Sequence, residues 1–383
     1  MKILYYGSTT QIHSGASQWM YRMVNEMEER GHETVAILPK DSGIADWYHD
    51  SGLETRFLWS SPIRRRRSPI GQVFYLFRSL VAVVSLVSII VREDIDAVHV
   101  NEIKYPHGLL AGKIAGVATV CHVRAYIGSS MLRRLLGGYV ALLSDEIVCV
   151  SERTREYIFH DVGIQKGNIG VIHDAVPSPE RFEGISDSSD FRKMYGVDED
   201  SFLVVQVSKL ARLKGQERLL DVARLVEETT EKVEFCIVGG EIDGHESYAT
   251  ELRSRAKDID SVHMVGFHPD VIEVFAAADV VVHLPRHEDP FPGVVLEGML
   301  AGKPVIGSNS GGIPEQIDVG ETGFIVPKEG NADKIAEYIL RLYEDEQTRE
   351  QMGRMAYERV RERFPVDGYF DEIERLYSNL PTS

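Results

Sequence analysis

The segment 288–304 combines carboxylates, prolines and glycines in an order that suits phosphate binding. It reads EDPFPGVVLEGMLAGKP and follows an apolar, strand-like run. A short helix is predicted to begin near Gly293 and to stop before Pro304. The first N–H groups of a helix lack partners inside it and carry partial positive charge, so they can hold a phosphate. We therefore predict that a phosphate binds the backbone of Gly293, Val294 and Val295.

A carboxylate in the first turn of that helix, Glu297, adds a second kind of contact. Such a carboxylate is favourable near a helix N-terminus, and it can accept hydrogen bonds from a ribose diol. The alternative interpretation is an ordinary acidic first turn without a ligand. A phosphate-binding backbone beside a diol-binding carboxylate favours a nucleotide site.

Two lysines follow the apolar run that begins at Phe202. Lys209 and Lys214 lie on one loop, and Gly215 then introduces another predicted helix. Cations at the carboxyl end of a strand and beside a helix N-terminus suit a diphosphate. Lysines on a surface loop usually only face water, but this loop is basic in a chain whose formal net charge is -17. We predict that both lysines bind the diphosphate.

A small-residue loop follows the first predicted strand, which ends at Gly7. The loop contains His13, Ser14 and Gly15, and the backbone of Gly15 is predicted to approach the same phosphates. Small residues are common in loops between strands and helices, so this signal is weak by itself.

Two sets of apolar runs must position these residues. Runs begin at positions 3, 34, 97, 119, 146 and 169, and a second set begins at positions 202, 234, 262, 279, 304 and 323. Apolar strands that alternate with helices predict parallel sheets covered on both faces. We predict an α/β fold of two Rossmann-like, doubly wound domains, 1–176 and 177–365, with the ligand in a cleft between them. A last helix, 366–383, is predicted to pack back on the first domain.

Composition narrows the class of protein. A chain of 383 residues, 43% of them apolar, fits two domains. The acidic balance opposes nucleic acid as a partner, because phosphate backbones need a basic surface. The three cysteines, Cys121, Cys149 and Cys236, lie in apolar runs without zinc-type spacing, so buried thiols are predicted. The chain starts directly with a strand, which predicts no secretory signal and a cytoplasmic protein.

One basic run stands out in this acidic chain. Arg64 to Arg67 precede a long apolar pattern over 70–91, which polar residues interrupt. A buried or half-buried helix is favoured over a membrane span, which needs about 20 nearly uninterrupted apolar residues. The arginines are interpreted as a solvated loop, with contact to the inner face of the membrane as the alternative.

The motifs together resemble those of glycosyltransferase family 4. Residues 289–305 resemble the family's donor-binding motif, in which seven residues separate two carboxylates. Further matches are SKL at 208–210 with KG at 214–215, SGA at 14–16 with RGHE at 30–33, VGG at 238–240, HMVGF at 263–267 and GGIPE at 311–315. The resemblance covers nearly the whole chain. It implies a GT-B fold and metal-independent transfer from a UDP- or GDP-linked sugar, with the anomeric configuration retained.

The resemblance also implies roles for particular residues. Glu297 would bind the donor ribose, Lys209 and Lys214 the diphosphate, and Asp289 or Glu288 the sugar hydroxyl groups. His122 resembles the family's sugar-facing histidine; a histidine satisfied at a strand end is the alternative. The nucleobase would be flanked by Gly266, Phe267 and His268. The implied acceptor is a glycan or a lipid-linked glycan, in the synthesis of cell-surface polysaccharide or glycolipid.

Two positions depart from the family pattern. Asp289 lies eight positions before Glu297, where the family usually has glutamate, and the adjacent Glu288 is the alternative contact for the sugar. Lys209 replaces an arginine, which keeps the charge but loses the bidentate geometry.

Competing functions have weaker support. Asp94-Ile95-Asp96 fits a metal-binding D-x-D pattern but precedes a strand instead of following one. No G-x-G occurs, which opposes a dinucleotide-dependent oxidoreductase. A nucleotide-sugar epimerase on the same architecture and a degenerate nucleotide-binding protein remain as alternatives.

Overall fold

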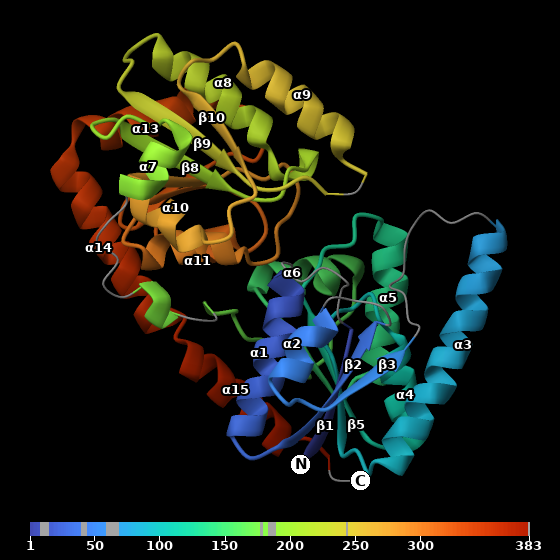
Figure 1. The fold of residues 1–383 in the computed structure, drawn as a ribbon. Coiled ribbons are helices and arrows are strands. Elements are labelled where there is room, and N and C mark those ends of the chain that lie inside the picture. Colours follow the sequence, from blue (N-terminus) through green and yellow to red (C-terminus); the bar gives the residue numbers. More distant parts are fainter. Residues whose placement is uncertain are drawn as a thin grey trace. The chain divides into compact units, whose positions relative to one another are not determined.

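The computed structural model describes residues 1–7, 15–39, 44–58, 69–176, 179–182, 189–242 and 244–381. The predicted loop residues His13 and Ser14 and the run from Arg64 to Arg67 lie outside these ranges. The chain divides into two compact units (Figure 1). Unit 1 comprises Met1–His173 and Asp367–Ser383, and unit 2 comprises Asp174–Val366. The boundary between them thus falls three residues before the position that the sequence pattern predicts.

Unit 1 is built on a parallel sheet of seven strands in the order β3-β2-β1-β4-β5-β6-β7. The strands are β1 (Lys2–Tyr6), β2 (Glu33–Pro39), β3 (Thr55–Leu58), β4 (Ala97–Val100), β5 (Ala118–Val123), β6 (Glu146–Cys149) and β7 (Ile169–Val171). The helices are α1 (Gly15–Glu29), α2 (Ile44–Asp50), α3 (Pro69–Arg92), α4 (His107–Ala115), α5 (Ser130–Leu143), α6 (Glu152–Ile158) and α15 (Val366–Ser378). Six strands match the predicted runs. The sequence pattern misses β3, because this short edge strand has a polar, half-exposed surface.

The last helix, α15, belongs to unit 1 through buried aromatic contacts. The Tyr377 hydroxyl lies 2.9 Å from that of Tyr5 and 2.6 Å from His99 Nδ1. Tyr369 and Phe370 of the same helix pack against Trp19 of α1. Arg30 at the end of α1 forms ion pairs with Asp371 and Glu374 on the exposed side.

Unit 2 repeats the pattern with six parallel strands in the order β10-β9-β8-β11-β12-β13. The strands are β8 (Phe202–Val207), β9 (Val233–Val238), β10 (Val262–Gly266), β11 (Val280–His283), β12 (Val305–Ser308) and β13 (Gly323–Val326). The helices are α7 (Ser189–Tyr195), α8 (Gln216–Glu227), α9 (Glu246–Ala256), α10 (Val271–Ala277), α11 (Gly293–Leu300), α12 (Ile313–Gln316), α13 (Ala332–Glu344) and α14 (Glu346–Arg363). All six strands match predicted runs. The strands are apolar on both faces because helices cover the sheet on each side (Figure 1).

Two glycines let loops at the carboxyl end of this sheet touch one another. Gly239 has φ +155°, and a Cβ there would lie 1.8 Å from the Ser208 carbonyl oxygen. Gly311 has φ +53°, and a Cβ there would lie 1.7 Å from the Asp289 carbonyl oxygen. No other residue fits either position, because both the backbone angle and the space exclude a side chain. The loops that carry Lys209 and Asp289 are therefore held by backbone contacts.

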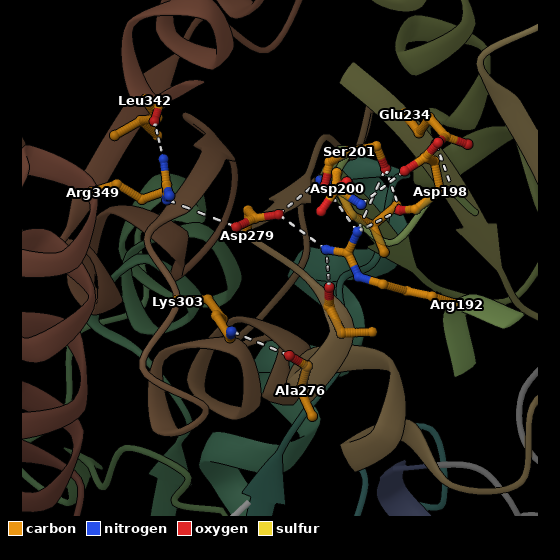
Figure 2. Close-up of polar contacts among 12 residues, drawn as sticks. Arg192, Asp198, Asp200, Ser201, Glu234, Ala276, Asp279, Lys303, Leu342 and Arg349 are labelled. Carbon is orange, nitrogen blue, oxygen red and sulfur yellow. Dashed lines mark hydrogen bonds and ion pairs between the residues drawn. The ribbon is translucent and has the colours of Figure 1, made fainter. Parts of the chain in front are cut away.

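A polar network anchors the opposite end of the sheet (Figure 2). Asp279 precedes β11, and its Oδ2 accepts hydrogen bonds from the Leu203 N–H at 2.9 Å and from Arg192 Nη2 at 3.2 Å. Arg192 also donates to the carbonyl oxygens of Ser201 and Ala277 at 2.8 Å. The Asp279 carboxylate thus links α7, β8 and β11 in one buried cluster.

Replacing Asp279 by asparagine is expected to destabilise the protein. The substitution keeps an acceptor for the Leu203 N–H but leaves the Arg192 guanidinium, buried in this cluster, without its counter-charge. Breaking a partly buried ion pair in this way costs about 2 kcal/mol of unfolding free energy. Urea unfolding of Asp279→Asn measures the loss, with the exposed Asp258→Asn as the matched control. Equal midpoints for the two variants would show that the network contributes nothing.

Candidate active site

An ion-paired carboxylate lies where three loops of unit 2 meet. Lys214 ends the short helical turn that follows β8, and its Nζ lies 2.5 Å from Asp289 Oδ2. The same oxygen lies 2.9 Å from Nε2 of His283, the last residue of β11. The structure therefore brings together the predicted residues Lys214 and Asp289 and adds His283, which the sequence analysis did not single out. Its signal was a polar residue at the carboxyl end of an otherwise apolar strand.

The charges of this cluster are fixed by burial and by one another. Burial raises the pKa of Asp289, but the Lys214 ammonium and the hydrogen bond from His283 outweigh it and hold the pKa well below its usual range. Burial lowers the pKa of His283, although Asp289 opposes that shift. Asp289 is accordingly an ionised carboxylate at neutral pH, and it cannot serve as a general acid there.

The neighbouring carboxylate, Glu288, is occupied by other partners. One oxygen accepts a hydrogen bond from the Gly311 N–H at 2.5 Å, and the other lies 2.7 Å from Lys328 Nζ. These contacts tie Glu288 to the loop after β12. They leave Asp289, and not Glu288, on the side of Lys214.

The N-terminus of α11 offers two N–H groups and not the predicted three. Within the part of the chain that the structure describes, the N–H groups of Gly293 and Val294 have no acceptor. The Val295 N–H instead donates to the Pro292 carbonyl oxygen at 3.2 Å, which corrects the prediction for that residue. This bond spans three residues, the 3₁₀-type spacing that is common at the ends of α-helices.

Glu297 lies just beyond the first turn of α11, not within it as predicted, because the helix begins at Gly293. A Cβ on Gly293 would lie 3.9 Å from Glu297 Oε1, so the glycine keeps the approach to the carboxylate open. Burial raises the pKa of Glu297 to about 7, and the positive charge of Arg181 opposes this shift. A partly buried carboxylate next to two N–H groups without acceptors has the geometry of a nucleotide site.

Lys209 lies on the same loop as Lys214. Burial lowers the pKa of Lys209, and the Lys214 ammonium lowers it further. Gln216 holds this loop from α8, since its side-chain nitrogen donates to the Ser208 hydroxyl at 2.9 Å and to the Lys209 carbonyl oxygen at 2.8 Å. Lys209 and Lys214 place two cations near one another on this loop, which makes the loop suited to an anion.

The segment predicted for the nucleobase divides into two parts. Gly266 ends β10 with φ +80°, and the Phe267 side chain is 56% exposed. His268 is buried, and its two ring nitrogens lie 3.0 Å from the Tyr195 hydroxyl and 3.0 Å from a Glu273 oxygen. Both ring nitrogens of His268 are therefore used inside unit 2, which leaves its backbone for a ligand, and its place beside the nucleobase stays a prediction.

Two predicted residues belong to unit 1. Gly15 is the first residue of α1. His122 lies in β5 and is fully buried, with its ring 5.6 Å from His99 and 6.5 Å from Tyr369. Burial lowers the pKa of His122 well below its usual value, and Arg124 lowers it further, so the imidazole is neutral. Its Nε2 has no hydrogen-bond partner among the described residues.

Other features of the sequence have structural roles. The three cysteines are buried and free, as predicted. Asp96 of the D-x-D pattern accepts a hydrogen bond from the Lys2 N–H at 2.7 Å, which fixes the start of β1. Across the described ranges, no group of three or more His, Cys, Asp or Glu side chains is arranged to hold a metal ion.

Two family models match this chain. The model "Glycosyltransferase Family 4" matches residues 13–178, and "Glycosyl transferases group 1" matches residues 187–359. The N-acetyl-alpha-D-glucosaminyl L-malate synthase of Bacillus anthracis is 27% identical over 302 residues, which cover 76% of each chain. Crystal structures of Anabaena Alr3699/HepE with UDP and with UDP-glucose are both 23% identical to this chain. Their TM-scores are 0.85 and 0.83, and both matches cover 99% of this chain and 100% of that one.

The matches agree with the motifs in both halves of the sequence and with the two parallel sheets of the structure. The chain belongs to glycosyltransferase family 4, and it is a glycosyltransferase with the GT-B fold.

Proposed function

We propose that this protein transfers a sugar from a nucleotide diphosphate sugar to a hydroxyl group of a glycan or lipid-linked acceptor, with retention of configuration and without a metal ion. The single observation that carries the proposal is the grouping of Lys214, Asp289 and the N-terminus of α11 at the carboxyl end of one sheet. The Anabaena protein of the same fold binds UDP and UDP-glucose, so a UDP-linked hexose is the first donor to test.

Unit 2 supplies the groups for the donor. The N–H groups of Gly293 and Val294 face a phosphate, and the Lys214 ammonium neutralises the charge that grows on the diphosphate as it leaves. Lys209 adds a second cation. Glu297 accepts hydrogen bonds from the ribose diol. Local donors of this kind are needed because the chain as a whole is strongly acidic.

The reaction breaks the bond between the anomeric carbon and the diphosphate oxygen, and that electron pair stays on the diphosphate. The acceptor oxygen forms the new bond to the anomeric carbon on the same face. Its proton passes to the leaving phosphate oxygen, so atoms and charges balance. Asp289 is ionised by its partners and orients sugar hydroxyl groups as a hydrogen-bond acceptor. The proposed contacts of His122 and Gly15 with the donor remain predictions.

Thermal unfolding in the presence of EDTA tests the donor site. A ligand that binds only the native state at a concentration 100-fold above its Kd stabilises it by about 2.7 kcal/mol. For units of this size the melting temperature then rises by about 5 °C or more. UDP-glucose is expected to give this shift with EDTA present, and Glu297→Ala is expected to remove it.

The outcomes separate the proposal from its alternatives. A shift that requires added magnesium would overturn metal independence. Conversion of UDP-glucose to another nucleotide sugar without any acceptor would instead identify an epimerase. Binding without turnover of any sugar acceptor would indicate a degenerate binding protein. NMR of the anomeric proton in the product decides between retention and inversion.

A further inference from the structure

Three helices of unit 1 contain no carboxylate. α3, α4 and α5 have neither Asp nor Glu, although the chain has 59 acidic residues. The charged side chains of these helices are all basic: Arg78, Arg92, Lys113, Arg133 and Arg134. The connections through α3, α4 and α5 cross the sheet in one direction, so the three helices lie on one side of it (Figure 1). These three helices of an acidic protein are therefore free of carboxylates, although α6, which the same rule places on this side of the sheet, carries Glu152 and Glu156.

The same side exposes large apolar side chains. On α3, Phe74, Phe77, Leu80 and Val84 are 62–65% exposed, and on α5, Met131 and Leu135 are 72% and 63% exposed. We call these six side chains, together with Arg78 and Arg134, the α3–α5 face. Single exposed apolar residues are normal on soluble proteins, but the four on α3 form a row on one helix, and such a grouped set marks an interaction surface.

The spacing makes this face continuous along each helix. Phe77, Leu80 and Val84 repeat at intervals of three and four residues, and Met131 and Leu135 are four residues apart. The opposite side of α3 is also apolar, and Ala82, Val83, Leu86 and Ile90 on that side lie in the core of unit 1. The core accounts for one apolar side of α3 and leaves the other to be explained.

We propose that the α3–α5 face docks on an anionic lipid bilayer. Apolar side chains flanked by arginines partition into the interface of such a membrane, where headgroups attract the positive charge. The sequence adds four consecutive arginines, Arg64 to Arg67, directly before α3. Carboxylates would be repelled by anionic headgroups, which explains their absence from these helices.

The face lies on the membrane and does not cross it. α3 is held in the core of unit 1 by its buried side, which a membrane-spanning helix would have to give up. Of the helices that the structure describes, none is long and apolar enough to span a bilayer. A second copy of the chain fits the face less well, because a two-fold interface would bring two copies of the same basic surface together, with no carboxylate on α3 or α5 to neutralise Arg78 and Arg134.

Vesicle flotation tests the proposal with the whole chain. We expect the protein to float with phosphatidylcholine vesicles that contain phosphatidylglycerol, and not with phosphatidylcholine alone. The double variant Phe77→Gln/Leu80→Gln is expected to bind the anionic vesicles about 30-fold more weakly, because two large apolar side chains no longer insert. The double variant Arg78→Gln/Arg134→Gln is expected to lose about fivefold for each arginine.

Matched substitutions in unit 2 provide the control. Met194 and Val319 are exposed to nearly the same extent as Phe77, at 65% and 64%, and Met194→Gln/Val319→Gln is expected to bind vesicles like the wild type. Thermal stabilisation by UDP-glucose shows for each variant whether the donor site is intact, so failure here is distinguishable from failure of the proposed function. The proposal is overturned if the wild-type protein does not float with anionic vesicles. It is also overturned by a wild-type dimer that Phe77→Gln/Leu80→Gln converts to monomer, since the face then binds a second copy.

Discussion

Lys214→Met is expected to lower kcat/KM for sugar transfer by about 10²- to 10³-fold, the cost of removing one charged group that stabilises a developing anion. The ammonium group lies 2.5 Å from Asp289 Oδ2, at the carboxyl end of the sheet of unit 2. Methionine keeps most of the side-chain volume, so packing around η3 (Arg212–Lys214) changes little. The loss should fall on kcat as well as on KM, because the charge on the diphosphate grows in the transition state.

A second consequence follows from the same ion pair. Without the ammonium, the Asp289 carboxylate keeps its hydrogen bond with His283 but loses its counter-charge, and the pKa of Asp289 rises from its depressed position. Folding must therefore be checked by thermal unfolding alongside the rate. Lys257→Met replaces an exposed lysine of the same unit and serves as the matched control, with activity equal to the wild type expected. Wild-type kcat/KM in a folded Lys214→Met protein would falsify the assignment of Lys214 to the diphosphate.

Glu297→Gln is expected to have opposite effects on stability and on donor binding. Burial raises the pKa of Glu297 to about 7 in the folded protein, from the 4.5 that is ordinary for a glutamate side chain. The folded state therefore holds this proton more tightly than the unfolded state, and the stability of the ligand-free protein falls as pH rises from about 4.5 to 7. Glutamine carries no charge to bury. At pH 8 the variant should be more stable than the wild type by on the order of 2 kcal/mol, since Glu297 is only partly buried.

The affinity for the donor should increase with pH, whereas the stability of the ligand-free protein decreases. An ionised carboxylate can accept hydrogen bonds from both ribose hydroxyl groups, so wild-type affinity for UDP-glucose is expected to rise as pH increases through about 7. Glu297→Gln should weaken binding by about 30- to 100-fold at pH 8 and flatten this pH dependence, as two charge-assisted hydrogen bonds become weaker. Calorimetry at several pH values measures both effects. The diphosphate of a nucleotide sugar does not titrate near neutrality, so the pH dependence of the affinity reports on the protein. Glu231→Gln, at an exposed position, is the control. If the affinity for UDP-glucose depends on pH in the same way for wild type and Glu297→Gln, Glu297 does not bind the donor.

The strands of unit 2 were predictable from the local pattern of apolar residues. All six coincide with apolar runs, because strands covered on both faces must be apolar along their length. The edge strand β3 was missed for the converse reason: an exposed edge does not need an apolar sequence. The start of α11 at Gly293 was predicted from Pro292, Gly293 and the following apolar residues. A proline fixes where a helix can begin whatever packs around it.

Pairing across the loops could not be predicted in the same way. The sequence favoured Asp289 by its spacing from Glu297 and kept Glu288 as the alternative. Only the fold gives Lys214 and His283 to Asp289, and Gly311 and Lys328 to Glu288. His268 is a second case in which the hydrogen-bond partners could not be predicted. No residue of its motif indicates that Tyr195 and Glu273 bind its ring.

The sequence by itself determined the fold class, the family and the segments that carry the candidate donor site. These follow from short-range rules, namely apolar periodicity, helix starts and stops, and motifs of fixed spacing. Tertiary structure alone decided the charge states of Asp289 and Glu297 and the exposure of the apolar side of α3. Burial and electrostatic pairing depend on residues distant in the chain, and such contacts exist only once the chain has folded.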